Sequence, residues 1–281
     1  MGRHARVVGP PAGPGRRERC PGALRPRYGW LGAYFAPLVA ELEGIRALLV
    51  DRPGWGLSDP VDFARRPYRE IVTDAMRRTL DDLGIERAHV VGASIGNLWA
   101  LRFAQDVPDR VERLVLLGGG PMSPEIAVPP FIKLLRSPVG RVIVALPEKP
   151  KMFRKQLEQM GHGATMRASD RLEPFVKWHA ALTRETAWAR HERDMVRAIA
   201  GRDGFVPGLL PSYEEIGEIR APTLMIVGDA DPIGSIDVWR RFVDGFSSGE
   251  LEVVRSGGHV LWLDDPATVG GWVSRFLTSS A

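Results

Sequence analysis

Hydrophobic and polar positions follow two alternating patterns along most of the chain. Short apolar runs are typical of strands buried in a parallel sheet, and between them apolar residues recur three and four positions apart, as on one face of a helix. The expected strands are residues 45–51, 87–92, 111–121, 223–228 and 251–254, and the expected helices are 34–44, 68–85, 94–107, 237–246 and 267–279. This alternation predicts an α/β fold, a mostly parallel sheet flanked by helices.

Residues 122–215 interrupt the alternation. They read as helices that contain Met and Trp and are separated by prolines, and "RVIVAL" at 141–146 is the one candidate strand among them. We therefore expect a core made of residues 29–121 and 216–281, with 122–215 as a helical insertion above the strand ends.

Residues 1–28 follow neither pattern. Arg, Pro and Gly make up 17 of these 28 residues, and the segment carries a net charge of +6 while the rest of the chain carries −2. The basic charge thus lies in an irregular tail, so we expect no nucleic-acid partner. No apolar run approaches the ~18 residues of a membrane span. Together with the single cysteine, Cys20, this indicates a cytoplasmic protein without a membrane partner.

Reactive side chains follow three of the expected strands. Ser94 lies between Gly92 and Gly96 directly after the strand at 87–92, Asp231 follows 223–228, and His259 follows 251–254 in a glycine-flanked loop. The carboxyl ends of parallel strands meet at one edge of a sheet, so we expect these three side chains to lie together.

The three residue types form the set that nucleophilic catalysis requires. A serine hydroxyl needs a neighbouring base, and a histidine base needs a carboxylate that fixes its tautomer. His259 is the only histidine that follows an expected strand, and Asp231 is preferred to Asp229 as the carboxylate. Glycines at 92 and 96 let the backbone approach a strained serine closely. The N–H of Ile95, at the start of the next helix, would face the oxyanion.

The order Ser94, Asp231, His259, together with "DRPGWGLSD" at 51–59, resembles the α/β-hydrolase family from about residue 30 onward. The resemblance implies that Ser94 is the nucleophile, His259 the general base and acid, Asp231 the orienting acid, and 122–215 the cap domain. Family members usually begin with an antiparallel hairpin and a strand ending in His-Gly, whose loop donates the second oxyanion N–H. This chain has no such strand, and Trp30, with Gly29 and Leu31, is the nearest candidate. Two interpretations remain: the chain has lost its first strands and half of the oxyanion hole, or residues 1–28 come from a wrong start or a shifted reading frame. We favour the second, so we expect the first strands to be missing or garbled.

The sequence predicts a serine hydrolase that cleaves a small-molecule ester, thioester or lactone through an acyl-enzyme, without metal or organic cofactor. A homodimer is possible. The alternatives are a non-catalytic binding module, a perhydrolase or haloperoxidase with the same triad, and a carbon–carbon bond hydrolase. Hydrolases of the last kind often carry Trp directly after the catalytic histidine, where this chain has Val260.

Overall fold

The computed structural model of the protein describes residues 32–279, except 56–57, 60, 147 and 187. Its centre is a sheet of four parallel strands in the order β1 (Ala88–Ala93), β2 (Val111–Leu117), β3 (Thr223–Gly228) and β4 (Gly249–Val254). Each strand matches an expected one to within a few residues, except that β2 ends before the glycines 118–120. The α/β class that the sequence predicts is confirmed.

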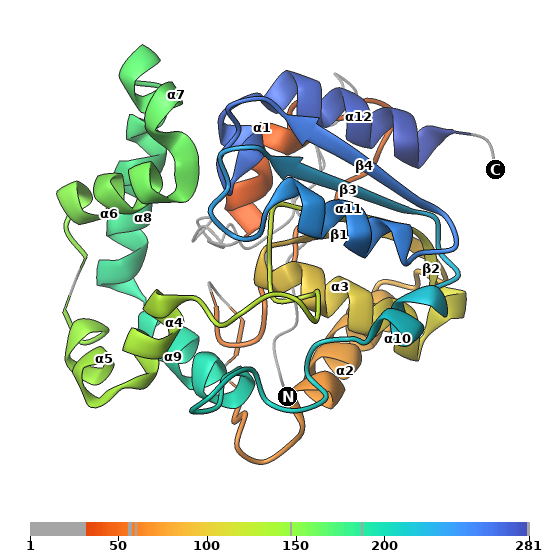
Figure 1. The fold of residues 1–281 in the computed structure, drawn as a ribbon, viewed down its shortest axis with the longest axis horizontal. Helices are drawn as coiled ribbons and strands as arrows, with labels where there is room; N and C mark the ends of the chain where they lie inside the picture. The colour runs from red at the N-terminus through yellow and green to blue at the C-terminus, as the bar shows by residue number, and fades with distance from the viewer. Residues whose placement is uncertain (1–31, 56–57, 60, 147, 187, 280–281) are drawn as a thin grey trace, which may run out of the picture.

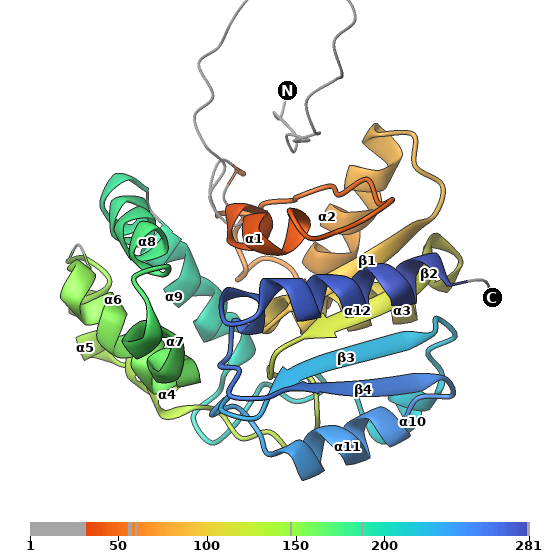
Figure 2. The ribbon, with the colours of Figure 1, turned by 90° about the horizontal axis from the view of Figure 1, so that it is seen from above.

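Helices cover both faces of this sheet. The larger helices are α2 (Tyr68–Asp82), α3 (Ile95–Asp106), α11 (Ile236–Asp244) and α12 (Pro266–Thr278), and shorter ones are η1 (Gly32–Phe35), α1 (Ala36–Val39), η2 (Pro108–Arg110), α10 (Tyr213–Gly217) and η4 (Leu261–Leu263). Figure 2 shows α11 and α12 on opposite sides of β3 and β4.

The period-2 alternation of strand side chains builds two hydrophobic cores. Leu114 and Leu116 pack with residues of α3 and α11, such as Phe103 and Phe242. Their neighbours Val115 and Leu117 pack in the other core, with residues of α1 and α12. Because every residue of β3 is buried, the sheet is closed on both faces there and presents its reactive groups only at its ends.

One expected strand and one candidate strand are wrong. Residues 45–51 form no strand, and β1 is the edge of the described sheet on that side. An apolar run becomes a strand only when another strand satisfies its backbone, and the described segment has no ladder partner. The run 141–146 is not a strand either, since helix α5 (Pro138–Ile143) occupies its start. Ser137 accepts the N–H of Gly140 at the N-terminus of α5, which stabilises the start of this helix.

The remaining helices form a separate layer beside the sheet. They are α4 (Pro130–Arg136), α5, α6 (Pro150–Leu157), the π-helical turn η3 (Glu158–His162), α7 (Gly163–Ala168), α8 (Glu173–Glu185) and α9 (Trp188–Ile199). Figure 1 shows this helical layer at the edge of the sheet toward which β3 and β4 point. Within the described residues, no helix is both long and apolar enough to cross a membrane.

Candidate active site

Ser94 occupies a strained turn between β1 and α3. Its φ of 52° and ψ of −122° are unusual for a residue with a side chain, and such a conformation costs about 1–3 kcal/mol. Neighbouring hydrogen bonds hold the turn: Ser94 N donates to Leu117 O at 3.1 Å, and the buried Asn97 side chain donates to Leu117 O at 3.1 Å. The end of β2 thus fixes the start of α3, which projects the Ser94 hydroxyl from the sheet.

The structure brings the three side chains expected from the sequence into one hydrogen-bonded chain. Ser94 Oγ lies 2.8 Å from His259 Nε2. His259 Nδ1 lies 3.2 Å from Asp231 Oδ1 and 3.0 Å from Asp231 Oδ2. The side chains of His259 and Asp231 are 5% and 1% exposed, so water does not compete for the bond between them.

The backbone around Asp231 keeps its carboxylate charged. Gly119 N donates to Oδ2 at 2.7 Å and Ile233 N donates to Oδ1 at 2.9 Å. Burial raises the pKa of Asp231, but the His259 ring and these hydrogen bonds lower it more, so the pKa lies below its usual value. The alternative acid, Asp229, is exposed and accepts the N–H of Ser256 at 2.6 Å, so it does not reach His259 through any recorded hydrogen bond.

The glycine run after β2 is a part of the site that the sequence analysis overlooked. A Cβ on Gly118, Gly119 or Gly120 would lie 2.5 Å from His259 O, 2.2 Å from Ile233 O or 2.5 Å from Ser94 O, respectively. The lack of a side chain at each glycine therefore leaves room for the backbone of one of the three loops that carry Ser94, Asp231 and His259. The sequence carries a signal for this feature, because three successive glycines follow a buried strand.

Of the two residues expected to bind an oxyanion, the structure describes Ile95 but not Trp30. Ile95 is the first residue of α3 and directly follows Ser94, which is the position that the prediction requires. Trp30 lies outside the described residues, as do Gly29, Leu31 and the whole segment 1–28, so the expectation of a missing or garbled N-terminus stays a prediction.

The triad opens into one end of a hollow of about 1120 Å³, which continues along β1 between the segment 42–52 and α2. Ser94 and His259 line the end beside the helical layer, and the apolar residues there include Trp99, Phe153, Met160, Phe175 and Trp262. Apolar and aromatic walls around a few polar groups are the usual form of a small-molecule site.

A family comparison agrees with this geometry. A model of the alpha/beta hydrolase family matches residues 20–270. The chain belongs to the alpha/beta hydrolase family.

Three proteins of named activity are similar to this chain in sequence or in fold. The chain is 34% identical over 227 residues to a 2-hydroxy-6-oxononadienedioate/2-hydroxy-6-oxononatrienedioate hydrolase of Cupriavidus pinatubonensis, covering 79% of this chain and 72% of the relative. The fold of this chain is similar to that of a meta-cleavage product hydrolase from Pseudomonas fluorescens, with a TM-score of 0.68 and 19% identity. The comparison covers 87% of this chain and 84% of the other. The fold is also similar to that of a carboxylesterase from Bacillus subtilis, with a TM-score of 0.66, 21% identity, and 89% and 80% covered.

A half-buried cation borders the hollow that the triad opens into. Arg52 lies 4.2 Å above the Trp55 ring, and its Nη2 is 3.7 Å from Glu192 Oε2. Trp55 Nε1 donates to the same carboxylate oxygen at 3.0 Å. Burial raises the pKa of Glu192, and Arg52 and Trp55 offset this only in part. The Arg52 side chain is 19% exposed and lines the hollow beside its partner Glu192.

A second polar group in the cavity comes from the helical layer. Tyr34 hydrogen-bonds to His179 Nδ1, and His179 Nε2 lies 3.0 Å from Glu148 Oε2. The Phe153 ring stacks on His179 with centroids 3.5 Å apart. No strand precedes His179 in the sequence, so the strand-end reasoning that found His259 gave no signal for it.

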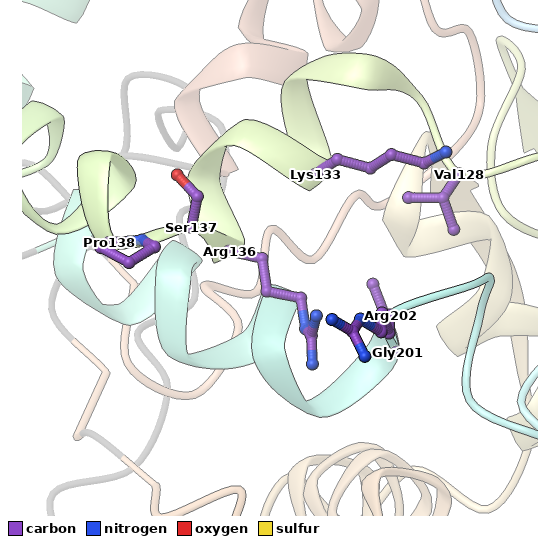
Figure 3. Close-up of a pocket in the computed structure, with 8 residues that line it drawn as sticks. Val128, Lys133, Arg136, Ser137, Pro138, Gly201 and Arg202 are labelled. Atoms are coloured by element: carbon purple, nitrogen blue, oxygen red, sulfur yellow. The ribbon is translucent and has the colours of Figure 1, made fainter.

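A smaller hollow of about 270 Å³ lies between α4 and the residues after α9. Lys133, Arg136 and Arg202 line it, and Figure 3 shows the two arginine side chains pointing toward one another. It shares no lining residue with the large cavity, so it is not part of the site that holds the triad.

Proposed function

We propose that this α/β hydrolase cleaves a carbon–carbon bond beside a ketone in a 2-hydroxy-6-oxo-dienoate, with Ser94 as nucleophile, His259 as base and acid, and Asp231 as orienting carboxylate. The observation that carries the proposal is the Ser94–His259–Asp231 chain, with contacts of 2.8 Å and 3.0 Å, at the aromatic end of the hollow. This chain supports hydrolysis through an acyl-enzyme, and the name of the Cupriavidus relative supports the choice of a carbon–carbon substrate.

The first half of the reaction forms an acyl-enzyme. The dienol ketonises when its hydroxyl proton moves to C5, and Ser94 Oγ then attacks the C6 carbonyl carbon while His259 Nε2 takes the hydroxyl proton. Asp231 stabilises the resulting imidazolium, and the Ile95 N–H faces the oxyanion. When the adduct collapses, the C5–C6 bond breaks and its electron pair passes into the conjugated 2-oxo acid. The leaving fragment then takes the proton from His259.

The second half of the reaction hydrolyses the acyl-enzyme and regenerates the free enzyme. A water molecule gives its proton to His259 Nε2 and attacks the acyl carbon, and Ser94 Oγ leaves with the proton that His259 returns. The apolar walls around Trp99 and Phe175 suit the conjugated chain, and Arg52 is the cation that we assign to a substrate carboxylate.

Ester hydrolysis is the second candidate function. It uses the same acyl-enzyme, and Val260 rather than Trp follows His259, which favours it. The two candidates differ in the leaving group, since an ester releases an alkoxide whereas the dienoate releases a delocalised carbanion that needs a proton.

The test compares both substrate classes on one preparation. Loss of the dienolate absorbance of 2-hydroxy-6-oxonona-2,4-dienedioate, with 2-hydroxypentadienoate and succinate as products, is expected at a higher kcat/KM than hydrolysis of p-nitrophenyl acetate and butyrate. Ser94→Ala should remove both activities, and Ser169→Ala, an exposed serine of the helical layer, should remove neither. Turnover of esters alone would overturn the carbon–carbon assignment.

A fluorophosphonate probe tests whether the triad is catalytic at all. The probe reacts with activated serines, so labelling that disappears in Ser94→Ala supports an enzyme. A folded protein that is not labelled would support the non-catalytic binding module instead.

A further inference from the structure

A second histidine–carboxylate pair lies beside the loop that carries His259. His162 Nδ1 is 2.8 Å from Asp264 Oδ2, and the side chains of the two residues are 0% and 6% exposed. His162 belongs to turn η3 of the helical layer, and Asp264 directly follows η4 in the core. The mechanism proposed above uses neither residue.

This pair binds the backbone on both sides of His259. Gly258 N donates to Asp264 Oδ2 at 2.8 Å, and Val260 N donates to His162 Nε2 at 3.2 Å. Between them, His259 N donates to Met160 O at 2.8 Å. Three successive backbone N–H groups are therefore held by η3 and Asp264.

The hydrogen bonds also determine where the proton of His162 lies. Since Val260 N–H donates to Nε2, that nitrogen carries no proton, and Nδ1–H donates to Asp264. The other carboxylate oxygen, Asp264 Oδ1, accepts from Thr165 Oγ1 at 2.5 Å. All four polar atoms of the pair thus have partners, and a fully satisfied buried network of this kind has a fixed geometry.

The loop before His259 needs such support. Ser256 has a φ of 55°, and Gly257 and Gly258 follow it, so this backbone has few intrinsic restrictions. Turn η3 also approaches the Asp231 loop, because a Cβ on Gly161 would lie 2.3 Å from Ala230 O and 2.9 Å from Gly258 Cα. The turn therefore packs against the loops that carry both His259 and Asp231.

We propose that His162 and Asp264 are positioning residues for His259, and that they transmit the docking of η3 to the contact between His259 and Ser94. The inference rests on the proposed function of His259 as the base. A displacement of a reacting group by 1 Å can cost about 10²-fold in rate, so loss of this support lowers the chemical step and leaves substrate binding largely intact.

His162→Phe is the main test, because it keeps the ring and removes both hydrogen bonds. The rate of fluorophosphonate labelling and kcat should both fall by about 10- to 100-fold, with KM nearly unchanged. His162→Gln keeps an acceptor for Val260 N–H and should recover most of the lost rate. His191→Phe, in α9 and not among the residues that line the hollow of the triad, is the matched control and should label at the wild-type rate.

The labelling readout separates this proposal from the function proposed above, because the probe does not depend on the natural substrate. Wild-type protein that is not labelled contradicts both proposals. Labelling of His162→Phe at the wild-type rate contradicts the positioning role alone, as does a loss of rate that His162→Gln does not recover. If His162→Phe does not fold, Asp264→Asn decides the question: a fall in labelling rate supports the role, and an unchanged rate overturns it.

Discussion

The charge of the Asp231 carboxylate depends on backbone N–H groups that lie around it. Its two oxygens accept N–H groups from Gly119 and Ile233 and also face His259 Nδ1. Burial alone would favour the neutral acid, but these three donors favour the carboxylate, so the pKa of Asp231 is lowered. The charge that an imidazolium at His259 requires is therefore present throughout the neutral range.

Asp231→Asn should lower kcat by about 10⁴-fold, because an amide can hold His259 in the wrong tautomer and stabilises no imidazolium. Pre-steady-state release of p-nitrophenol or fluorophosphonate labelling would measure the loss. Asp229→Asn is the control, since Asp229 is exposed on the same loop, and its rate should stay within a few-fold of wild type. The reverse ranking of the two variants would assign the acid to Asp229.

Glu192 leads to a prediction about how the stability of the protein changes with pH. Its pKa is raised by burial, despite Arg52 and Trp55. The stability that its protonated form provides is present below the unfolded pKa and is lost as pH rises through the folded pKa. Glu192→Gln should therefore gain stability relative to wild type as pH rises from 4 to 8.

Urea unfolding across that pH range measures the difference in the free energy of unfolding. Glu185→Gln replaces a carboxylate whose side chain is 61% exposed, and its difference from wild type should not grow with pH. A Glu192→Gln variant that loses stability at pH 8 would show that the charge of Glu192 is needed beside Arg52.

The convergence of side chains could be predicted where a strand places each of them. Ser94, Asp231 and His259 each follow a strand, and the carboxyl ends of parallel strands meet, so their convergence follows from the sequence. His162 and His179 lie in helices whose packing on the core is set by three-dimensional contacts. Their partners, Asp264 and Glu148, are 102 and 31 residues away, and no local pattern connects them.

At the scale of elements, the turn between β1 and α3 depends on one of its two glycines for space. A Cβ on Gly92 would lie 2.6 Å from Gly96 O and 2.8 Å from Asn97 Cα, whereas a Cβ on Gly96 would meet no atom within 4 Å. From the sequence, both glycines are expected to allow a close approach of the backbone. The structure supports close approach at Gly92 and leaves the surroundings of Gly96 open.

Gly92→Ala should lower the free energy of unfolding by about 1–3 kcal/mol, because β1 or α3 must move to admit the methyl group. Gly96→Ala should instead raise it by up to about 1 kcal/mol, because alanine favours the helix. Urea titration of both variants against wild type measures the two changes. Equal destabilisation by the two alanines would show that the turn is strained at both positions.

The predicted elements failed where an apolar run lacked the context of its neighbours. Residues 45–51 and "RVIVAL" have strand composition, but one has no ladder partner in the described sheet and the other begins within α5 after the Ser137 cap. Composition reports which residues tolerate burial in a sheet, whereas the hydrogen-bond partners that make a strand come from elsewhere in the chain.

At the scale of the whole molecule, the parallel sheet could be predicted and the placement of the helical layer could not. The order of strands and helices fixes the core through its alternation, which needs no distant information. Contacts such as Arg154 with Glu173 hold the helices of the layer together. Contacts such as His162 with Asp264 join the layer to the core. Domain boundaries at 121–122 and 215–216 therefore stay predictions.

Arg102 links the segment that leaves the helical layer to the core. This arginine of α3 is 2% exposed, and its guanidinium donates to Gly208 O and Leu209 O, each at 2.9 Å, and to Glu215 Oε1 at 2.9 Å. Arg102→Lys keeps the charge but cannot reproduce this planar set of donors. Since hydrogen bonds to charged groups contribute about 1.5–3 kcal/mol each, and lysine can keep one of the three, we expect a loss of about 3–6 kcal/mol in the free energy of unfolding.

Thermal and urea unfolding of Arg102→Lys measure this loss. The exposed pair of Arg220 and Asp109, whose side chains are 75% and 91% exposed, provides the control. Arg220→Lys should change the free energy of unfolding by less than about 0.5 kcal/mol. Limited proteolysis locates the effect, because weaker attachment of residues 201–212 predicts faster cleavage there than within β2 or β3. A variant that loses stability without faster cleavage in that segment would show that Arg102 stabilises α3 and not the return from the helical layer.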